Sequence, residues 1–266
     1  MNQQTLNEPS RWQQRLRAMG PGIMMASAAV GGSHIIASTQ AGALYGWQLA
    51  LIIVLANLFK YPFFRFGPQY TLETGKSLLE GYAEKSRVYL WVFFVLNLFA
   101  TVINTAAVSM LCAAILSFVL PGEWSMNALS VAVLASAVLM LLVGPYRTVD
   151  AMSKIIMISL TITTVAAVAL AASKGAQMQP DFIEPNPWNW GALAFIVALM
   201  GWMPAPIEIS AINSLWVSAK RKLEKVSYED GLFDFNVGYI STAILALVFL
   251  ALGALVQYGS GSEVKM

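Results

Sequence analysis

Long apolar runs separated by short polar segments make up most of this 266-residue chain. A run of about 20 apolar residues is long enough for a helix to cross a bilayer. We count seven such spans, and the pattern predicts an all-α polytopic membrane protein. Their expected bounds are 20–43, 47–66, 88–119, 126–144, 152–173, 190–217 and 233–257.

The first of these spans is interrupted at its middle. Gly31 and Gly32 are followed by Ser33 and by His34, the single histidine of the chain. A glycine costs a helix roughly 1 kcal/mol relative to alanine. A broken span also frees backbone groups, which a membrane tolerates only where the break lines a cavity or is buried in protein. We expect a functional break here; the alternative is a glycine-rich packing face with one buried histidine.

The sixth span carries a second interruption. Pro204 and Pro206 each lack an amide proton and crowd the preceding turn, and Gly201 lies just before them. We expect the helix to break at 203–206, with a proline kink satisfied by neighbouring groups as the alternative. Interruptions at corresponding positions of two halves are typical of carriers built from inverted repeats. The first five-helix repeat is then complete, and the second is represented by two spans.

The composition agrees with a membrane protein and excludes several function classes. Hydrophobic residues make up 58% of the chain and charged residues 11%, whereas soluble domains carry roughly 25% charged residues. A net charge of +2 gives no reason to expect a nucleic-acid partner. The single cysteine, Cys112, excludes an internal disulfide. With one histidine and no nucleophile beside a base at a recognisable spacing, we expect neither an enzyme nor a resident cofactor.

Lysine and arginine are distributed unevenly between the two sides of the expected membrane domain. An N-terminus in the cytoplasm places fourteen of the sixteen on the cytoplasmic side, where membrane proteins concentrate them. The fourteen are Arg11, Arg15, Arg17, Lys60, Arg65, Lys76, Lys85, Arg87, Arg147, Lys154, Lys220, Arg221, Lys222 and Lys225. We expect a protein integral to the inner or plasma membrane, with a cytoplasmic segment at 1–18, a transmembrane domain at 19–258 and an external tail at 259–266.

The polar segment 67–87 is expected to lie on the membrane surface as a loop. It can also form a helix, and the spacing of Glu73, Lys76 and Glu80 would place alternating charges on one helical face. Segment 174–190, with three prolines and two tryptophans, is expected to be an interfacial loop.

Several short motifs resemble the opening half of the Nramp family of divalent-metal transporters. They are Gly20-Pro21-Gly22, Gln40-Ala41-Gly42, Tyr45-Gly46, Thr74-Gly75-Lys76, and Met203-Pro204, the last of which is similar to the family's Met-Pro-His metal motif. The resemblance runs from about Gly20 to Tyr258 and implies a LeuT-like fold of eleven or twelve helices. It also implies that a C-terminal part is missing, so the expected partners are a divalent metal ion, the lipid bilayer and a C-terminal remainder of the transporter.

The chain departs from the family at its metal and proton positions. Where the family has Asp-Pro-Gly-Asn, this chain has Gly31-Gly32-Ser33-His34, and the family's histidine after Met-Pro is Ala205. Two acidic positions of the third span correspond to Asn97 and Asn104, and a third to Ala107. This pattern is similar to the Nramp-related magnesium transporter branch, which has lost the proton-coupling acids.

These considerations give two sets of candidate site residues. The expected metal-binding residues are Gly31, Ser33, His34 and Met203, and the expected ion-pathway residues are Glu208, Asn97, Asn104 and Ala205.

Several members of these sets have a structural alternative. Met203 offers a soft thioether ligand, although membrane methionines commonly only pack. Glu208 is the only carboxylate well inside a span, and such acids are functional by default; a structural pair with His34 or a serine is its alternative. Asn97 and Asn104 share a helical face with Thr101, where they could instead join helices through hydrogen bonds.

We expect the function to be transport of Mg²⁺, Mn²⁺ or both by alternating access, without obligatory proton coupling. Backbone carbonyls at the half-helix ends, with retained waters, would supply an oxygen-rich shell suited to a hard cation. A LeuT-like symporter of a small organic substrate and a non-transporting truncated membrane subunit are the competing interpretations.

Overall fold

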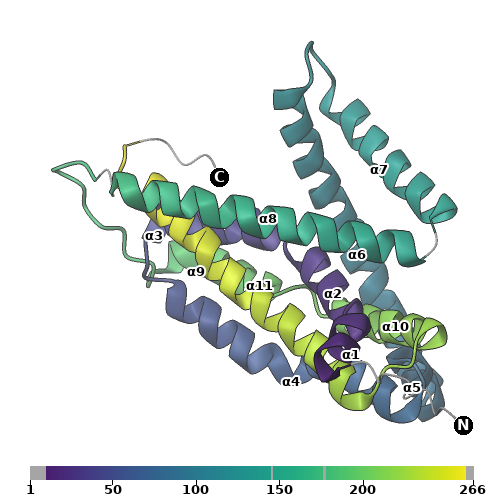
Figure 1. Ribbon diagram of the computed structural model, residues 1–266. Coiled ribbons are helices and arrows are strands. Elements are labelled where there is room, and N and C mark those ends of the chain that lie inside the picture. The colour runs from purple at the N-terminus through teal and green to yellow at the C-terminus, as the bar shows by residue number, and fades with distance from the viewer. Residues whose placement is uncertain (1–9, 145, 176–177, 262–266) are drawn as a thin grey trace, which may run out of the picture.

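The computed structural model describes residues 10–144, 146–175 and 178–261, and every regular element within them is a helix (Figure 1). A short helix, α1 (Arg11–Ala18), precedes the first span. Five helices are long and apolar enough to cross a membrane in the described part of the chain. They are α4 (Ala50–Thr74), α6 (Arg87–Val119), α7 (Met126–Val143), α8 (Tyr146–Lys174) and α11 (Tyr228–Val256).

The remaining two spans are each divided, as the sequence predicts. The first consists of α2 (Pro21–Ala29), a π-helical turn η1 (Ser33–Ser38) and α3 (Thr39–Tyr45). The sixth consists of α9 (Trp190–Trp202) and α10 (Glu208–Leu223). The seven predicted spans and both predicted breaks are therefore confirmed.

The second span is longer than predicted, because α4 runs to Thr74 rather than ending near residue 66. Pro68 lies inside this helix and cannot donate to the carbonyl of Phe64. The hydroxyl of Ser210, on α10, donates toward the Phe63 and Phe64 carbonyls over 3.1 and 3.3 Å. A neighbouring helix thus supplies the hydrogen bond that the proline removes, which lets the helix continue.

The expected surface loop at 67–87 is also corrected. After Thr74 the chain turns at Gly75, in the left-handed conformation, and enters α5 (Leu78–Lys85). Glu73 and Glu80 therefore lie on different helices rather than on one face. Ser77 caps α5, and its backbone N–H and hydroxyl both donate to Glu80, which lowers the pKa of that carboxyl.

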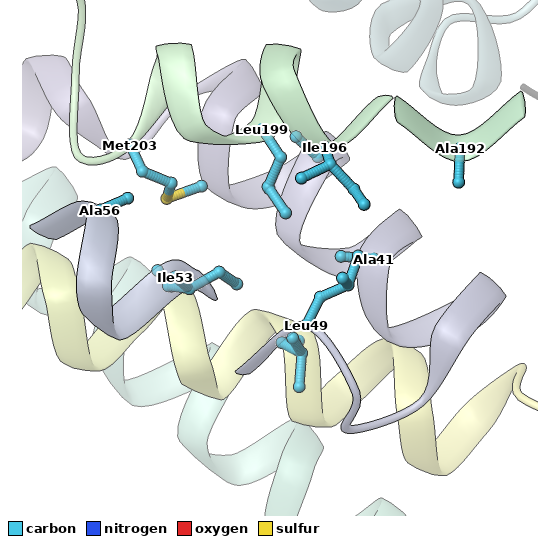
Figure 2. Close-up of a cluster of buried hydrophobic side chains, with 11 residues drawn as sticks. Ala41, Leu49, Ile53, Ala56, Ala192, Ile196, Leu199 and Met203 are labelled. Carbon is cyan, nitrogen blue, oxygen red and sulfur yellow. The ribbon is translucent and has the colours of Figure 1, made fainter. Parts of the chain in front are cut away.

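The first and seventh spans pack at the closest distances in the fold. A Cβ atom on Gly42 would lie 2.0 Å from the Leu250 carbonyl oxygen, and one on Gly253 would lie 2.0 Å from that of Thr39. Only glycine allows the two backbones to approach this closely. Beside this contact, α3, α4, α9 and α11 enclose an apolar cluster (Figure 2). Its buried residues are Ala37, Ala41, Leu49, Ile53, Ala56, Ala192, Ile196, Leu199, Met203, Ala246 and Leu250.

Helices α6 and α7 form a hairpin that leans away from this bundle (Figure 1). In their most apolar windows only 11% and 6% of residues are buried, compared with 50% in α11. One face of α6 nevertheless borders the two broken spans, and this face positions the polar residues of the candidate site.

Candidate functional site

The first break opens a gap in the backbone hydrogen bonding at mid-span. Helix α2 ends where the Val30 N–H donates to Ala26, and the Gly31 N–H turns back to Ala29. The chain then resumes as the π-helical turn η1. A Cβ atom built on Gly31 would meet no other atom within 4 Å, so this position faces open space.

The second break separates α9 from α10 over residues 203–207. Pro204 follows Met203 through a cis peptide bond. Because proline has no N–H, it cannot serve the Met200 carbonyl four residues earlier. The Lys60 amine, on α4, donates to this oxygen over 2.6 Å and to the Gly201 carbonyl over 2.8 Å.

A cavity of about 500 Å³ lies between the two breaks and α6. Its size is within the range of small-ligand sites. The polar side chains on its wall are Ser27, Asn97, Thr101, Asn104, Thr105 and Glu208. The rest of the wall is formed by Ala28, Ala29, Gly31, Gly32, Ile36, Ala107, Val108, Leu111, Trp202, Pro206, Ile209 and Ile212.

Glu208 is the one titratable side chain among the described residues that line the cavity. It is buried and occupies the first position of α10, where the partial positive charge of a helix N-terminus favours a carboxylate. The Asn104 amide donates to its Oε1 over 2.9 Å. Its partner is thus an asparagine of α6, not the histidine or serine considered as a structural pair.

Asn97 lies two turns before Asn104 on the same helix. Its side-chain oxygen is buried and has no hydrogen-bond partner within the described structure. A buried acceptor without a partner is costly. Asn97 therefore brings a buried acceptor without a protein partner to the cavity wall, on the same helix as Asn104.

The structure separates the predicted site residues into two groups. Gly31, Asn97, Asn104 and Glu208 share the cavity wall. His34, Met203 and Ala205 do not line it. The Ser33 side chain lies outside the described part of the structure.

The second group packs elsewhere in the protein. The His34 ring is buried and donates from Nε2 to the Thr242 carbonyl of α11 over 2.9 Å. Met203 is fully buried in the apolar cluster and points toward Ala56 (Figure 2), with the Ser38 hydroxyl 4.0 Å from its sulfur. Ala205 belongs to another apolar cluster, beside residues such as Phe64.

Lys60 is a residue of this region to which the sequence pattern assigned no site role. It is counted above among the charges expected on the cytoplasmic side, and it lies near the middle of α4. The available signal was its position inside an apolar run, where a charged residue is expensive and indicates function.

The donors in the cavity are oxygens rather than sulfur or imidazole. One carboxylate and two amide oxygens come from side chains, and hard cations such as Mg²⁺ and Mn²⁺ prefer such ligands. In the described ranges no group of three or more His, Cys, Asp or Glu side chains is placed to hold a metal ion. An ion at this site would be coordinated largely by neutral oxygens.

The sequence profile of the Nramp family, described as natural resistance-associated macrophage protein-like, matches residues 22–266. The chain belongs to the Nramp family. A curated relative, an uncharacterized protein of Pasteurella multocida (strain Pm70), is 66% identical over 262 residues. The match covers 97% of this chain and 60% of the relative, so the chain spans less than two thirds of that protein's length.

A solved structure supports the Nramp fold independently. The manganese transporter of Eremococcus coleocola, crystallised with an aromatic bis-isothiourea compound, superposes with a TM-score of 0.72 at 17% identity. The superposition covers 97% of this chain and 55% of the transporter. The fold is the LeuT-like inverted repeat, with the first repeat complete and two spans of the second present.

Proposed function

We propose that this Nramp chain carries the ion-binding half of a transporter for divalent metal cations that works by alternating access. The observation that carries the proposal is the cavity between the two broken spans. Glu208, with its buried carboxylate, and Asn97, whose side-chain oxygen has no protein partner, both line this cavity. A broken helix at mid-membrane with acceptor groups around it is the usual construction of a cation site in carriers of this architecture.

The donor set favours Mg²⁺ and Mn²⁺ as the transported ions. Oxygen ligands suit both, and Mg²⁺ in particular retains several waters when it binds. Gly31 leaves open space in the wall where a larger residue would intrude. A partly hydrated ion therefore fits the cavity better than a fully dehydrated one, and the Met203 thioether packs in the apolar cluster instead.

An organic substrate has less support. A carrier for amino acids would direct a helix N-terminus at the substrate carboxylate. Here the N-terminus of α10 already carries the Glu208 carboxylate, which would repel a second negative charge. The cavity is therefore better suited to a cation than to an anionic group.

We further propose that transport does not require proton symport. A continuous proton pathway needs several titratable side chains, and Asn97, Asn104 and Ala107 cannot supply them. The membrane potential would then be the main drive, worth roughly 2.3 kcal/mol per charge per 100 mV. In this proposal the N-terminus is cytoplasmic and the protein lies in the inner or plasma membrane.

A binding titration tests the central step. Mn²⁺ added to the 266-residue chain in lipid nanodiscs can be followed through the electron paramagnetic resonance signal of the free ion. Glu208→Gln should weaken binding at least about tenfold, because it removes the one charged ligand while preserving shape. Glu224→Gln is the matched control, since Glu224 lies at the far end of α10, paired with Lys220. Equal affinity in the parent and Glu208→Gln would refute a cation site at this cavity.

A further inference from the structure

Lys60 places a positive charge at the carbonyl end of the first half of the sixth span. It comes from the middle of α4 and is partly buried. Its amine reaches two consecutive carbonyl oxygens in the last turn of α9, those of Met200 and Gly201, at 2.6 and 2.8 Å. Within the described residues no carboxylate forms an ion pair with it; the recorded ion pairs involve other lysines and arginines.

Both carbonyls are available because the helix stops just after them. In an uninterrupted helix they would accept from residues 204 and 205, but Pro204 has no N–H and the helix ends at Trp202. The last carbonyls of a helix also carry its partial negative charge. They therefore form an attractive position for a cation at mid-span, and an ammonium group fills it.

The two half-helices of the sixth span thus meet side chains of opposite charge at the break. The positive end of α10 carries Glu208 and faces the cavity, whereas the negative end of α9 carries the Lys60 ammonium. An ammonium group bound to carbonyl oxygens resembles a bound metal ion in two ways: it carries positive charge, and its partners are oxygen atoms. Its distances to the two oxygens are those of strong, charge-assisted hydrogen bonds.

We propose that the Lys60 ammonium is a tethered cation that competes with the transported divalent ion for the carbonyl end of α9. The inference rests on the proposed function and adds a determinant of its affinity. With Lys60 in place, the carbonyl end of α9 already holds a cation, so the ion is held mainly from the Glu208 side. Binding stays weak enough for release, which a transport site requires as much as capture. Removing the charge while keeping a hydrogen-bond donor should therefore strengthen divalent binding.

Charge variants of Lys60 test this with the Mn²⁺ titration in nanodiscs. Lys60→Gln keeps an N–H donor without charge and should bind Mn²⁺ at least about tenfold more tightly than the parent. Lys60→Arg keeps the charge and should stay within about twofold of the parent. If Lys60 only caps α9, Lys60→Gln will bind like the parent, and that result, or weaker binding, overturns the proposal.

A second measurement keeps the test valid if Lys60→Gln folds poorly. Cys112 is the single cysteine, so Lys60→Cys in a Cys112→Ser background offers one reactive thiol. An aminoethyl thiosulfonate reagent restores a positive amine at residue 60, whereas a methyl thiosulfonate adds a neutral group of the same linkage. The proposal predicts weaker Mn²⁺ binding after the aminoethyl reagent than after the methyl reagent; equal binding contradicts it.

The outcomes also separate this inference from the function on which it rests. If Glu208→Gln abolishes binding while every Lys60 variant matches the parent, the cation site stands and the competition is refuted. If no variant binds Mn²⁺, both proposals are refuted. If the parent fails to bind and Lys60→Gln binds, the competition is supported in its strongest form.

Discussion

The two faces of the broken spans differ in whether protein groups contact their side chains. On the face toward α11 and α4, His34 and Met203 are buried against protein groups. On the face toward α6, Gly31 meets open space and the Asn97 oxygen has no protein partner. Gly31 and His34, which lie on opposite faces, belong to the same short stretch of chain. Residue types that look equally suited to binding therefore divide into those that pack against protein groups and those without a protein partner.

The sharpest test of this contrast is a pair of glycine substitutions. Gly42→Ala should lower the free energy of unfolding by about 3 kcal/mol, because its Cβ would lie 2.0 Å from the Leu250 carbonyl oxygen and force α3 from α11. Gly31→Ala, on the cavity face, should change it by less than about 0.5 kcal/mol. Thermal unfolding in detergent, followed by tryptophan fluorescence, measures both. Equal effects at the two positions would contradict the difference between the packed face and the cavity face.

A smaller effect is expected at Met203, and it should appear in stability rather than in binding. Met203→Ala leaves a hole in the apolar cluster and should cost about 2 kcal/mol of unfolding free energy. Met203→Leu conserves volume and should cost less than about 1.5 kcal/mol. Mn²⁺ affinity, compared per folded molecule, should match the parent in both. A selective loss of affinity in the well-folded Met203→Leu variant would show that the thioether is a metal ligand.

The smallest effect is expected within the cavity, at the asparagine that holds the carboxylate. Asn104→Ala removes the hydrogen bond to Glu208 and should weaken Mn²⁺ binding about fivefold, corresponding to about 1 kcal/mol. Val108→Ala changes an apolar side chain on the same wall, where no oxygen is lost, and serves as the control. Identical affinities in the two variants would show that Asn104 does not position the carboxylate.

The breaks themselves could be read from the sequence. Paired glycines and paired prolines inside apolar runs disfavour a continuous helix through their own backbone properties. These properties do not depend on the rest of the fold. The end of α4 could not be read in this way. In the sequence, Pro68 indicates the end of a helix. The helix continues past it because Ser210, 142 positions away along the chain, donates toward the Phe63 and Phe64 carbonyls.

The sequence indicated which residue types form the site, but not which way their side chains point. Apolar context marked Glu208 as unusual, yet its partner Asn104 lies on another helix, a contact that no local pattern encodes. The π-helical turn changes the angular spacing of side chains after Ser33, so a helical wheel cannot tell which way His34 points. Lys60 was not recognised as a site residue for a related reason, because the carbonyls that it binds, those of Met200 and Gly201, lie on another helix.

The most direct test of the account is to locate the ion. A crystal structure of the chain with bound Mn²⁺, recorded at a wavelength where manganese scatters anomalously, would place it without assuming any ligand. If the cavity is the ion site, one strong peak lies inside it, within about 2.6 Å of a Glu208 oxygen or separated from it by one water. A peak beside the Met203 sulfur or the His34 ring, with the cavity empty, would contradict it.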